Sequence, residues 1–287
     1  MIRAIAIIVL LLINLSFWGS LVLVLSLAKF FVRGPKKAPI IRFLAKFGEG
    51  WVAGNNRIFD MLLTTQWDIE GIDGIEYDGH ILIISNHVSW VDIFALFRAF
   101  HRKAAFIRFF LKRELIWFPI AGQACWALEF PFMRRYTPEY LEKHPEKRGQ
   151  DLETTRVLCR RYRRVPVAIL NFVEGTRFTR EKQADQDSPY RHLLRPRIGG
   201  ISFVLASFGD QLDAVFDVTL AYPNGDITMW EFITNRVPRI VIRARKLEVT
   251  PEMIDPAITQ PGPAREMLKE WIDGIWREKD ALLATLA

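Results

Sequence analysis

A run of 25 residues without a charge, from Ala4 to Ala28, constrains the fold of this chain more than any other feature. The run is apolar almost throughout, and a helix of about 20 apolar residues is long enough to cross a bilayer. The apolar core of a cleavable signal peptide is shorter, at about 7 to 15 residues. We therefore predict a membrane anchor over residues 1–33, in preference to a buried core helix, followed by one domain over residues 34–287.

The charges that flank this anchor predict its orientation. Arg3 precedes the uncharged run, and four cations follow it: Lys29, Arg33, Lys36 and Lys37. Positive residues concentrate on the cytoplasmic side of membrane helices, so we expect the domain on the cytoplasmic side of a membrane, of the bacterial inner-membrane type. One spanning helix and two shallow helices joined near Asn14 to Gly19 both fit the composition.

The overall charge is positive, with 39 Lys and Arg against 32 Asp and Glu, a net charge of +7. Such a surplus suits an anionic surface. Because an anchored chain already meets anionic lipids, we expect membrane phospholipids as its partner and no nucleic acid. The two cysteines, Cys125 and Cys159, match neither a disulfide framework nor a CxxC metal site.

Short apolar, β-branched runs alternate with helical patterns along the rest of the chain, which predicts an α/β fold with a mixed central sheet flanked by helices. The expected strands are 81–84, 104–107, 167–173, 215–222 and 239–249. The expected helices are 40–63 with an interruption near 54–56, 90–100, 151–162, 200–208 and an amphipathic C-terminal helix over 263–286.

The first candidate for chemistry is the stretch ILIISNHVSWVDIF, residues 81–94. A buried strand that ends at His87 delivers this side chain to the sheet edge where α/β proteins bind ligands. Histidine accepts a proton near neutral pH, and Asp92 can fix its tautomer if the intervening loop turns back. Ser89 can supply an N-cap oxygen for the following helix. In the alternative reading, His87 caps the helix or fills a polar notch, and Asp92 is a first-turn acid favoured by the helix dipole.

A second strand-end motif, NFVEGTRFTR at 171–180, strengthens the catalytic reading. Gly175 lets the backbone turn sharply or approach a ligand, and Arg177 offers a planar cation suited to phosphate. Glu174, at a buried strand end, is expected to contact an arginine or a substrate hydroxyl. The alternative is a tight turn with a local Glu–Arg pair.

These segments resemble the glycerophosphate and lysophospholipid acyltransferase family, whose signatures are NHxSxxD and [FV]xEGTR. Three further stretches resemble family blocks in the same order, so that the likeness covers residues 80 to 223. The five stretches are NHVSWVD (86–92), KRELIWFPIAGQ (112–123), FVEGTR (172–177), LLRPRIGG (193–200) and VTLAYP (218–223). Two positions depart from the family pattern: Val173, where proline is frequent, and Arg134, where an aspartate is common.

The resemblance implies a role for each site residue. His87 removes the proton of an acceptor hydroxyl, and Asp92 orients His87. Phosphate is held by Arg177 together with Lys112 and Arg135, and the substrate-binding turn includes Glu174, Gly175 and Thr176. The acyl group comes from a thioester of coenzyme A or acyl carrier protein as co-substrate, and neither a bound cofactor nor a metal is expected.

The expected reaction is acyl transfer to the free hydroxyl of a lysophospholipid, with 1-acyl-glycerol 3-phosphate giving phosphatidic acid. Lysophosphatidylglycerol, lysocardiolipin or an ornithine lipid as acceptor, hydrolysis of the thioester, and a lipid-binding protein without catalysis are the alternatives. The apolar stretch 115–133 contains Pro119, Gly122, Glu129 and Pro131, which argue against a second span. We interpret it as a wall for acyl chains or as a membrane-facing surface.

Overall fold

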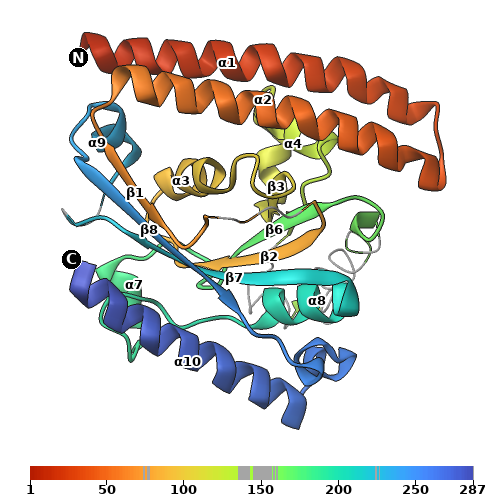
Figure 1. Cartoon of the computed structure of the whole chain (residues 1–287), viewed down its shortest axis with the longest axis vertical. Helices are drawn as coiled ribbons and strands as arrows, with labels where there is room; N and C mark the ends of the chain where they lie inside the picture. The colour runs from red at the N-terminus through yellow and green to blue at the C-terminus, as the bar shows by residue number, and fades with distance from the viewer. Residues whose placement is uncertain are drawn as a thin grey trace.

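A six-stranded mixed sheet forms the centre of the domain (Figure 1). The computed structural model describes residues 1–73, 75, 78–134, 143–144, 157, 159, 161–223, 225 and 227–286. The strand order is β1-β8-β7-β2-β6-β3, with β2 parallel to both of its neighbours and β7 antiparallel to β8. The strands are β1 Gln66–Glu70, β2 His80–Ser85, β3 Ile107–Phe109, β6 Val167–Phe172, β7 Leu212–Ala221 and β8 Arg239–Leu247.

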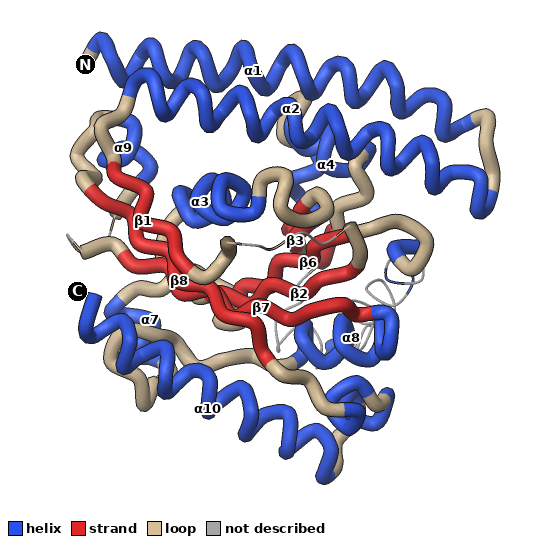
Figure 2. The backbone as a smooth tube through the Cα atoms, viewed as in Figure 1, coloured by secondary structure: helices blue, strands red, loops and turns tan. Residues whose placement is uncertain are grey.

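Helices cover both faces of the sheet and form two apolar cores (Figure 2). On one face lie α1 Ile2–Ser26, α2 Ala38–Leu62, α3 Val91–Phe100, α4 Ala121–Ala127 and α9 Met229–Ile233. On the other lie α8 Gly199–Phe208 and α10 Pro263–Leu286, with the short α7 Arg180–Asp185 near the end of α10. A small two-stranded sheet, β4 Leu111–Lys112 and β5 Phe132–Met133, follows the edge strand β3.

The predicted fold class is confirmed, because a mixed sheet lies between layers of helices and an apolar helix precedes it. The expected strands over 81–84, 167–173, 215–222 and 239–249 correspond to β2, β6, β7 and β8. The prediction missed β1, and it placed β3 too early, since this strand begins at Ile107. The predicted helix over 151–162 lies outside the described residues, apart from 157, 159 and 161–162.

The predicted interruption near 54–56 is wrong, since α2 continues through these residues without a break. The reason is the contact with α1. The side chain of Asn14 donates to the carbonyl of Trp51 at 2.9 Å and to Oδ1 of Asn55 at 2.9 Å, and it lies against Gly54. The Gly-Asn-Asn sequence therefore provides close helix packing and a polar contact between helices, where the sequence alone suggested a helix end.

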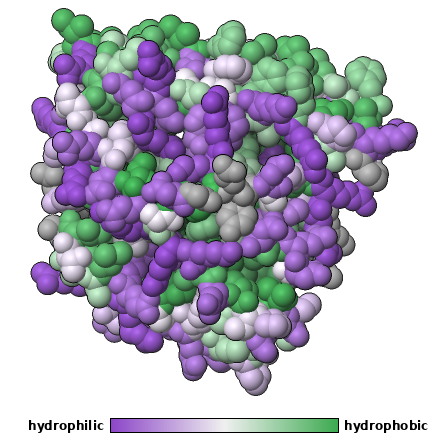
Figure 3. Space-filling view, in the orientation of Figure 1, coloured by the Kyte–Doolittle hydropathy of each residue, from purple (hydrophilic) through white to green (hydrophobic). Residues whose placement is uncertain are grey.

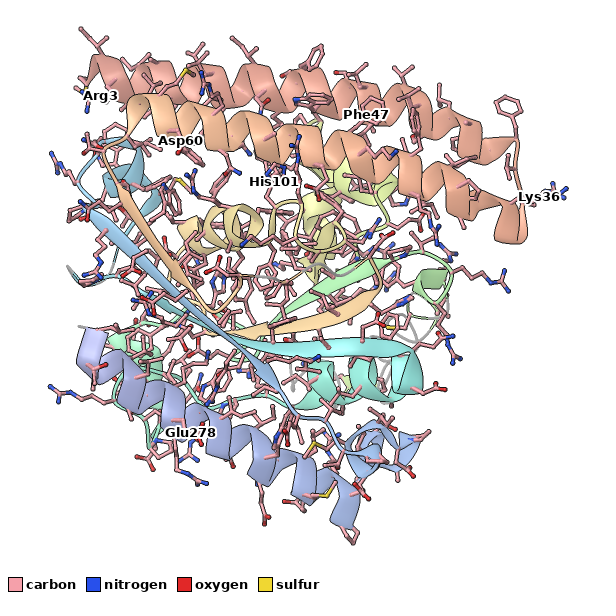
Figure 4. All side chains as sticks on the ribbon, viewed as in Figure 1. Arg3, Lys36, Phe47, Asp60, His101 and Glu278 are labelled. Atoms are coloured by element: carbon pink, nitrogen blue, oxygen red, sulfur yellow. The ribbon has the colours of Figure 1, made fainter. Side chains whose placement is uncertain are left out.

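Helix α1 lies along α2 as an antiparallel neighbour, and the two together form the outer layer of the molecule (Figures 1 and 4). The ring of Trp18 lies over Gly50, and Ile120 at the start of α4 lies against Gly19. The stretch Ile2–Phe30 is long and apolar enough to cross a membrane. Its outward side is unusually apolar and carries Ile5, Ile8, Val9, Leu12, Ile13, Phe17 and Val24 as exposed residues.

Helix α10 is attached to the sheet by a buried ion pair. Nζ of Lys279 lies 2.7 Å from Oδ1 of Asp217 and donates to the carbonyl of Val218 at 2.6 Å, and both charged side chains are inaccessible to water. Arg245 reaches the same carboxylate at 3.0 Å. Burial lowers the pKa of Lys279, an effect that the Asp217 carboxylate opposes. The docking of α10 therefore depends on a carboxylate in the centre of β7.

We predict that Asp217→Ala destabilises the protein by about 3 to 5 kcal/mol, because it leaves the Lys279 ammonium buried without a counter-charge. The double variant Asp217→Leu/Lys279→Met removes both charges and should recover most of this loss. Denaturant unfolding in detergent, followed by tryptophan fluorescence, gives the comparison. A double variant that is no more stable than Asp217→Ala would contradict the pairing as the source of the loss.

Candidate active site

The predicted histidine–aspartate pair forms at the carboxyl end of the central strand. Strand β2 ends at Ser85, and the chain turns through His87 before α3 begins at Val91, so that Asp92 faces back toward the loop. Nδ1 of His87 lies 2.7 Å from Oδ2 of Asp92. Since a carboxylate accepts from an N–H, Nδ1 carries the proton and Nε2 presents its lone pair. The Asp92 side chain is fully buried, whereas His87 keeps partial access to solvent.

The Asp92 carboxylate has four donors, which fixes its orientation. Besides the imidazole, Oδ2 accepts from the backbone N–H of Val88 at 2.6 Å and of Ser89 at 2.9 Å. Oδ1 accepts from the hydroxyl of Tyr222, the residue that follows β7. Asp92 thus combines the two readings of the sequence, because it is an acid in the first turn of α3 and also holds the histidine.

Asn86 secures the turn from the other side. Its amide donates to the carbonyl of Leu220 and accepts from the N–H of the same residue, each at 2.9 Å. The Asn86 side chain therefore continues the pairing between β2 and β7 for one more residue, and it is almost completely buried.

Glu174 supports the backbone of the histidine loop. Its Oε2 accepts from the N–H of His87 at 3.0 Å, and its Oε1 accepts from the N–H of Leu194 at 2.9 Å. These backbone donors stand where the sequence predicted an arginine or a substrate hydroxyl. Burial raises the pKa of Glu174 to about 8, although both hydrogen bonds act in the opposite direction. Glu174 therefore holds the backbone of His87 and of Leu194 in place, and its carboxylate is buried away from solvent.

Two aromatic residues orient the functional groups at the mouth of the site. The imidazole of His87 stacks on Phe172, the last residue of β6, with centroids 3.9 Å apart and planes 15° from parallel. The guanidinium of Arg177 lies 5.1 Å from the ring centre of Trp90, which belongs to the histidine motif. The two signature motifs are therefore in contact through their side chains as well as through Glu174.

The other residues of the EGTR turn are placed beside this pair. Gly175 adopts a φ of +70°, a left-handed conformation that favours glycine, and Arg197 Cδ lies 3.2 Å from where a Cβ would stand. Thr176 accepts a hydrogen bond from Nζ of Lys182 at 3.0 Å. Lys182 also donates to the carbonyl of Arg177 at 2.9 Å, while the side chain of Arg177 contacts Trp90.

The remaining predicted phosphate ligands are less closely joined to the site. Lys112 ends β4 and is 61% exposed, with Nζ 3.7 Å from a carboxylate oxygen of Glu114. Among the described residues, Lys112 forms no hydrogen bond or ion pair with His87 or Arg177. Arg135 lies outside the described residues.

The C-terminal helix reaches the site through the loop that precedes α8. Trp276 Nε1 donates to the carbonyl of Leu194 at 3.2 Å, while the N–H of Leu194 donates to Glu174. Asp280 accepts from the N–H groups of Arg191 and His192 at 2.9 and 2.7 Å. Sequence patterns do not predict these contacts, because they join segments 82 to 89 residues apart. Tyr222, in contrast, lies within the stretch VTLAYP that resembles a family block, although no role was predicted for it from the sequence.

With respect to metals, the described part of the chain holds no group of three or more His, Cys, Asp and Glu side chains that could bind an ion. The charged groups at the candidate site are instead one carboxylate–imidazole pair, one buried acid and several cations.

A family model described as Acyltransferase matches residues 66–221, which include β1 through β7 and both signature motifs. The chain belongs to the Acyltransferase family. The match confirms the resemblance predicted from the motifs. The match therefore includes the histidine turn, the EGTR turn and every strand of the central sheet except β8 Arg239–Leu247, which lies beyond residue 221.

Individual relatives are similar over different lengths. Lysocardiolipin acyltransferase 1 of Danio rerio is 33% identical over 132 residues, which are 42% of this chain and 32% of that protein. Probable 1-acyl-sn-glycerol-3-phosphate acyltransferase 5 of Arabidopsis thaliana is 25% identical over 283 residues, 94% of this chain and 68% of that protein. The chain spans 32% to 57% of the length of three curated relatives that it matches, and the Danio rerio protein is one of these three.

The fold is also shared with a solved structure, the 1-acyl-sn-glycerophosphate acyltransferase PlsC from Thermotoga maritima. The two chains superpose with a TM-score of 0.54 and 17% sequence identity, and the match covers 98% of each chain. The likeness includes the N-terminal helices as well as the sheet, since it covers nearly the whole chain.

Glu174 gives this site a testable dependence on pH. Its ordinary pKa of 4.5 rises to about 8 in the folded protein, so folding takes up a proton between these two values. Stability should therefore fall as pH rises across this window, with a slope of up to about 1.4 kcal/mol per pH unit, and level off above it. Glu174→Gln lacks this proton and should lack the slope. Melting temperatures of both proteins from pH 5 to pH 9 measure the difference, and parallel profiles would contradict a buried, proton-binding Glu174.

Proposed function

We propose that this protein is an O-acyltransferase that moves a fatty acyl group from a thioester to the free hydroxyl of a lysophospholipid. The observation that carries the proposal is the 2.7 Å contact between His87 Nδ1 and the buried Asp92, because it leaves Nε2 free to accept the acceptor's proton. Membership of the Acyltransferase family supports the same reaction class.

The chemistry follows from this geometry. Nε2 of His87 takes the hydroxyl proton as the acceptor oxygen forms a bond to the thioester carbonyl carbon. The C–S bond then breaks, and the imidazolium returns the proton to the leaving thiolate. Asp92 stabilises the imidazolium that exists between these steps, and Phe172 limits rotation of the ring. No nucleophile from the protein is needed, since the thioester is already activated.

The cations around the turn support an acceptor that carries phosphate. Arg177, fixed over Trp90, supplies a guanidinium beside the histidine motif. Lys112 ends strand β4, and Arg135 comes two residues after the end of β5 in the sequence. A guanidinium binds phosphate through two parallel hydrogen bonds. We propose 1-acyl-glycerol 3-phosphate as the acceptor, and a thioester of coenzyme A or acyl carrier protein as the donor.

A second acceptor is favoured by one specific observation. The relative from Danio rerio that is 33% identical is named as a lysocardiolipin acyltransferase. Lysocardiolipin and 1-acyl-glycerol 3-phosphate both present a free hydroxyl on a glycerol that carries phosphate, so the same base and the same cations would serve either one. The acceptor screen below separates them.

The direct test uses the full-length protein in detergent, an acyl-coenzyme A donor and a panel of lysolipids, with products identified by mass spectrometry. We expect a diacyl product, and we expect His87→Ala to lower its rate by about 100- to 10,000-fold, the usual contribution of a general base. The matched control is His192→Ala, a histidine whose contact with Asp280 is made by its backbone.

Three results would contradict this proposal or part of it. A His87→Ala variant with full activity would remove the proposed base. Release of free fatty acid at the same rate with and without acceptor would make the protein a thioester hydrolase. Product formed only from lysocardiolipin, lysophosphatidylglycerol or an ornithine lipid would support acyl transfer and would contradict 1-acyl-glycerol 3-phosphate as the acceptor.

We also propose that α1 lies in the plane of the membrane surface. Helix α2 packs along α1 and carries charged residues throughout its length, among them Arg42, Lys46, Arg57 and Asp60. If α1 crossed the bilayer in this arrangement, these charges would enter the hydrocarbon as well, at a cost of several kcal/mol each. An amphipathic hairpin in the interface avoids that cost and uses the exposed apolar side of α1. In this arrangement we place the domain on the cytoplasmic side.

Depth measurements distinguish the two arrangements of α1. Val9 and Val24 are both on the exposed side, and 15 residues of helix separate them by about 22 Å along the axis. Fluorophores attached at these positions should be quenched equally by lipids with a quencher at one depth if the helix lies in the plane. Quenching at clearly different depths would indicate a spanning helix.

A further inference from the structure

Two large aromatic side chains, Trp117 and Phe118, lie exposed on the surface of the domain. Trp117 is 82% exposed and Phe118 is 60% exposed, at the end of the short helix η3 Arg113–Trp117. Aromatic residues of this size usually bury most of their area, and neighbouring exposed ones mark a surface for a partner. The sequence left two readings of this stretch, a wall for acyl chains or a membrane-facing surface, and the exposure favours the second.

The segment that presents these residues is rigid. The carbonyl of Phe118 accepts from the N–H of Gly122 at 2.9 Å, and Nε2 of Gln123 donates to the carbonyl of Ile116 at 2.8 Å. Ile120 adopts a φ of +61°, which is unfavourable for a β-branched residue by about 1 to 3 kcal/mol. The turn is therefore held in a conformation that an unconstrained chain would leave.

The same turn is attached to α1. The side chain of Ile120 lies against α1, where Cγ2 is 2.5 Å from the position that a Cβ on Gly19 would occupy. At the end of α1, Lys29 pairs with Glu129, donates to the carbonyl of Ala127 at 3.0 Å and lies 5.9 Å from the ring centre of Trp126. Helix α4 and the aromatic turn thus sit directly beside the helix that we place at the membrane.

Exposed apolar residues continue from α1 toward this turn. Leu27, Phe30 and Phe31 at the end of α1 are 55%, 69% and 89% exposed, and Trp126 on α4 is 49% exposed. The space-filling view shows apolar side chains gathered along the edge of the molecule that α1 forms (Figure 3). Exposing an apolar surface of this kind to water would cost free energy, whereas contact with a lipid surface would cover it.

The charges next to the aromatic pair point to the same partner. Lys112, Arg113 and Glu114 are all exposed and precede Trp117 by a few residues, so this segment carries one net positive charge. In membrane proteins, tryptophan lies at the level of the lipid headgroups, and lysine and arginine interact with the phosphates. A peptide or protein partner would not account for the continuity with the apolar face of α1.

We propose that Trp117 and Phe118 insert into the membrane interface as a second contact, separate from α1. This inference rests on the proposed function, in which α1 lies on the membrane. A contact made through the α1–α2 hairpin alone lets the domain roll about the long axis of the hairpin, whereas a second contact beside it limits that rotation. The second contact then holds Lys112, five residues before Trp117, at the depth of lipid phosphates, where a lysophospholipid presents its headgroup.

The first test measures insertion directly. The variant Trp117→Cys, labelled with an environment-sensitive nitrobenzoxadiazole dye, is mixed with vesicles of phosphatidylethanolamine and phosphatidylglycerol. The native thiols should stay unlabelled near neutral pH, because burial raises the pKa of Cys125 to about 12 and that of Cys159 to about 11. The control label is at Ala284→Cys, an exposed position on α10 on the opposite side of the sheet from α1 (Figure 1).

We expect the dye at position 117 to brighten and to shift to shorter wavelengths on vesicles, and the dye at position 284 to stay unchanged. If the protein sediments with the vesicles and the dye at 117 does not respond, the proposed insertion of Trp117 and Phe118 is wrong, while the proposed position of α1 in the membrane interface is retained. If the protein does not bind vesicles, both are wrong.

The second test measures the consequence for the reaction. The variant Trp117→Ala/Phe118→Ala should raise the apparent KM for a long-chain acceptor in vesicles by roughly tenfold or more, because most of the inserted apolar area is lost. The KM for a short-chain acceptor in free solution should not change. The swap Trp117→Phe/Phe118→Trp should restore the wild-type KM, since it keeps the aromatic area. Equal increases in KM for both acceptors would show an effect on the fold of the site and would overturn the proposal.

Discussion

The organisation of the candidate site depends on one buried carboxylate. Asp92 is inaccessible to water, and it accepts from an imidazole, two backbone amides and a phenol. A buried charge is tolerated only when its lone pairs are occupied, so each of these groups is required to stay where it is. The histidine loop, the start of α3 and the end of β7 are thereby fixed to one another, and the orientation of the His87 ring is fixed with them.

A second set of polar contacts, made by Glu174 and by residues of α10, supports that arrangement. Glu174 links the backbone of His87 to the loop that contains Leu194, and Trp276 of α10 holds the other side of the same residue. Helix α10 is in turn docked by Lys279 on Asp217, in the middle of β7. The C-terminal helix lies outside the segment that matches the family, yet it supports residues inside it. Stability of the fold and geometry of the site are therefore linked through α10.

How much of this could be predicted from the sequence depends on the range of each interaction. The strands β2, β6, β7 and β8 and the pairing of His87 with Asp92 follow from local patterns, because apolar runs and a five-residue spacing are visible in the chain itself. The contact of Tyr222 with Asp92 spans 130 residues, and Trp276 with Leu194 spans 82, so neither has a local signature. The continuity of α2 through Gly54 was mispredicted for the same reason, since the partner that makes this glycine useful is Asn14 on another helix.

We propose that Asp92 acts on the reaction through His87. A double-mutant cycle of acyl transfer rates tests it, with the wild type, Asp92→Asn, His87→Ala and the variant that combines them. If the two residues act as one unit, Asp92→Asn lowers the rate in the wild-type protein and lowers it no further once His87 is gone. Losses that simply multiply in the combined variant would mean that Asp92 contributes independently, and would contradict the account of the site given above.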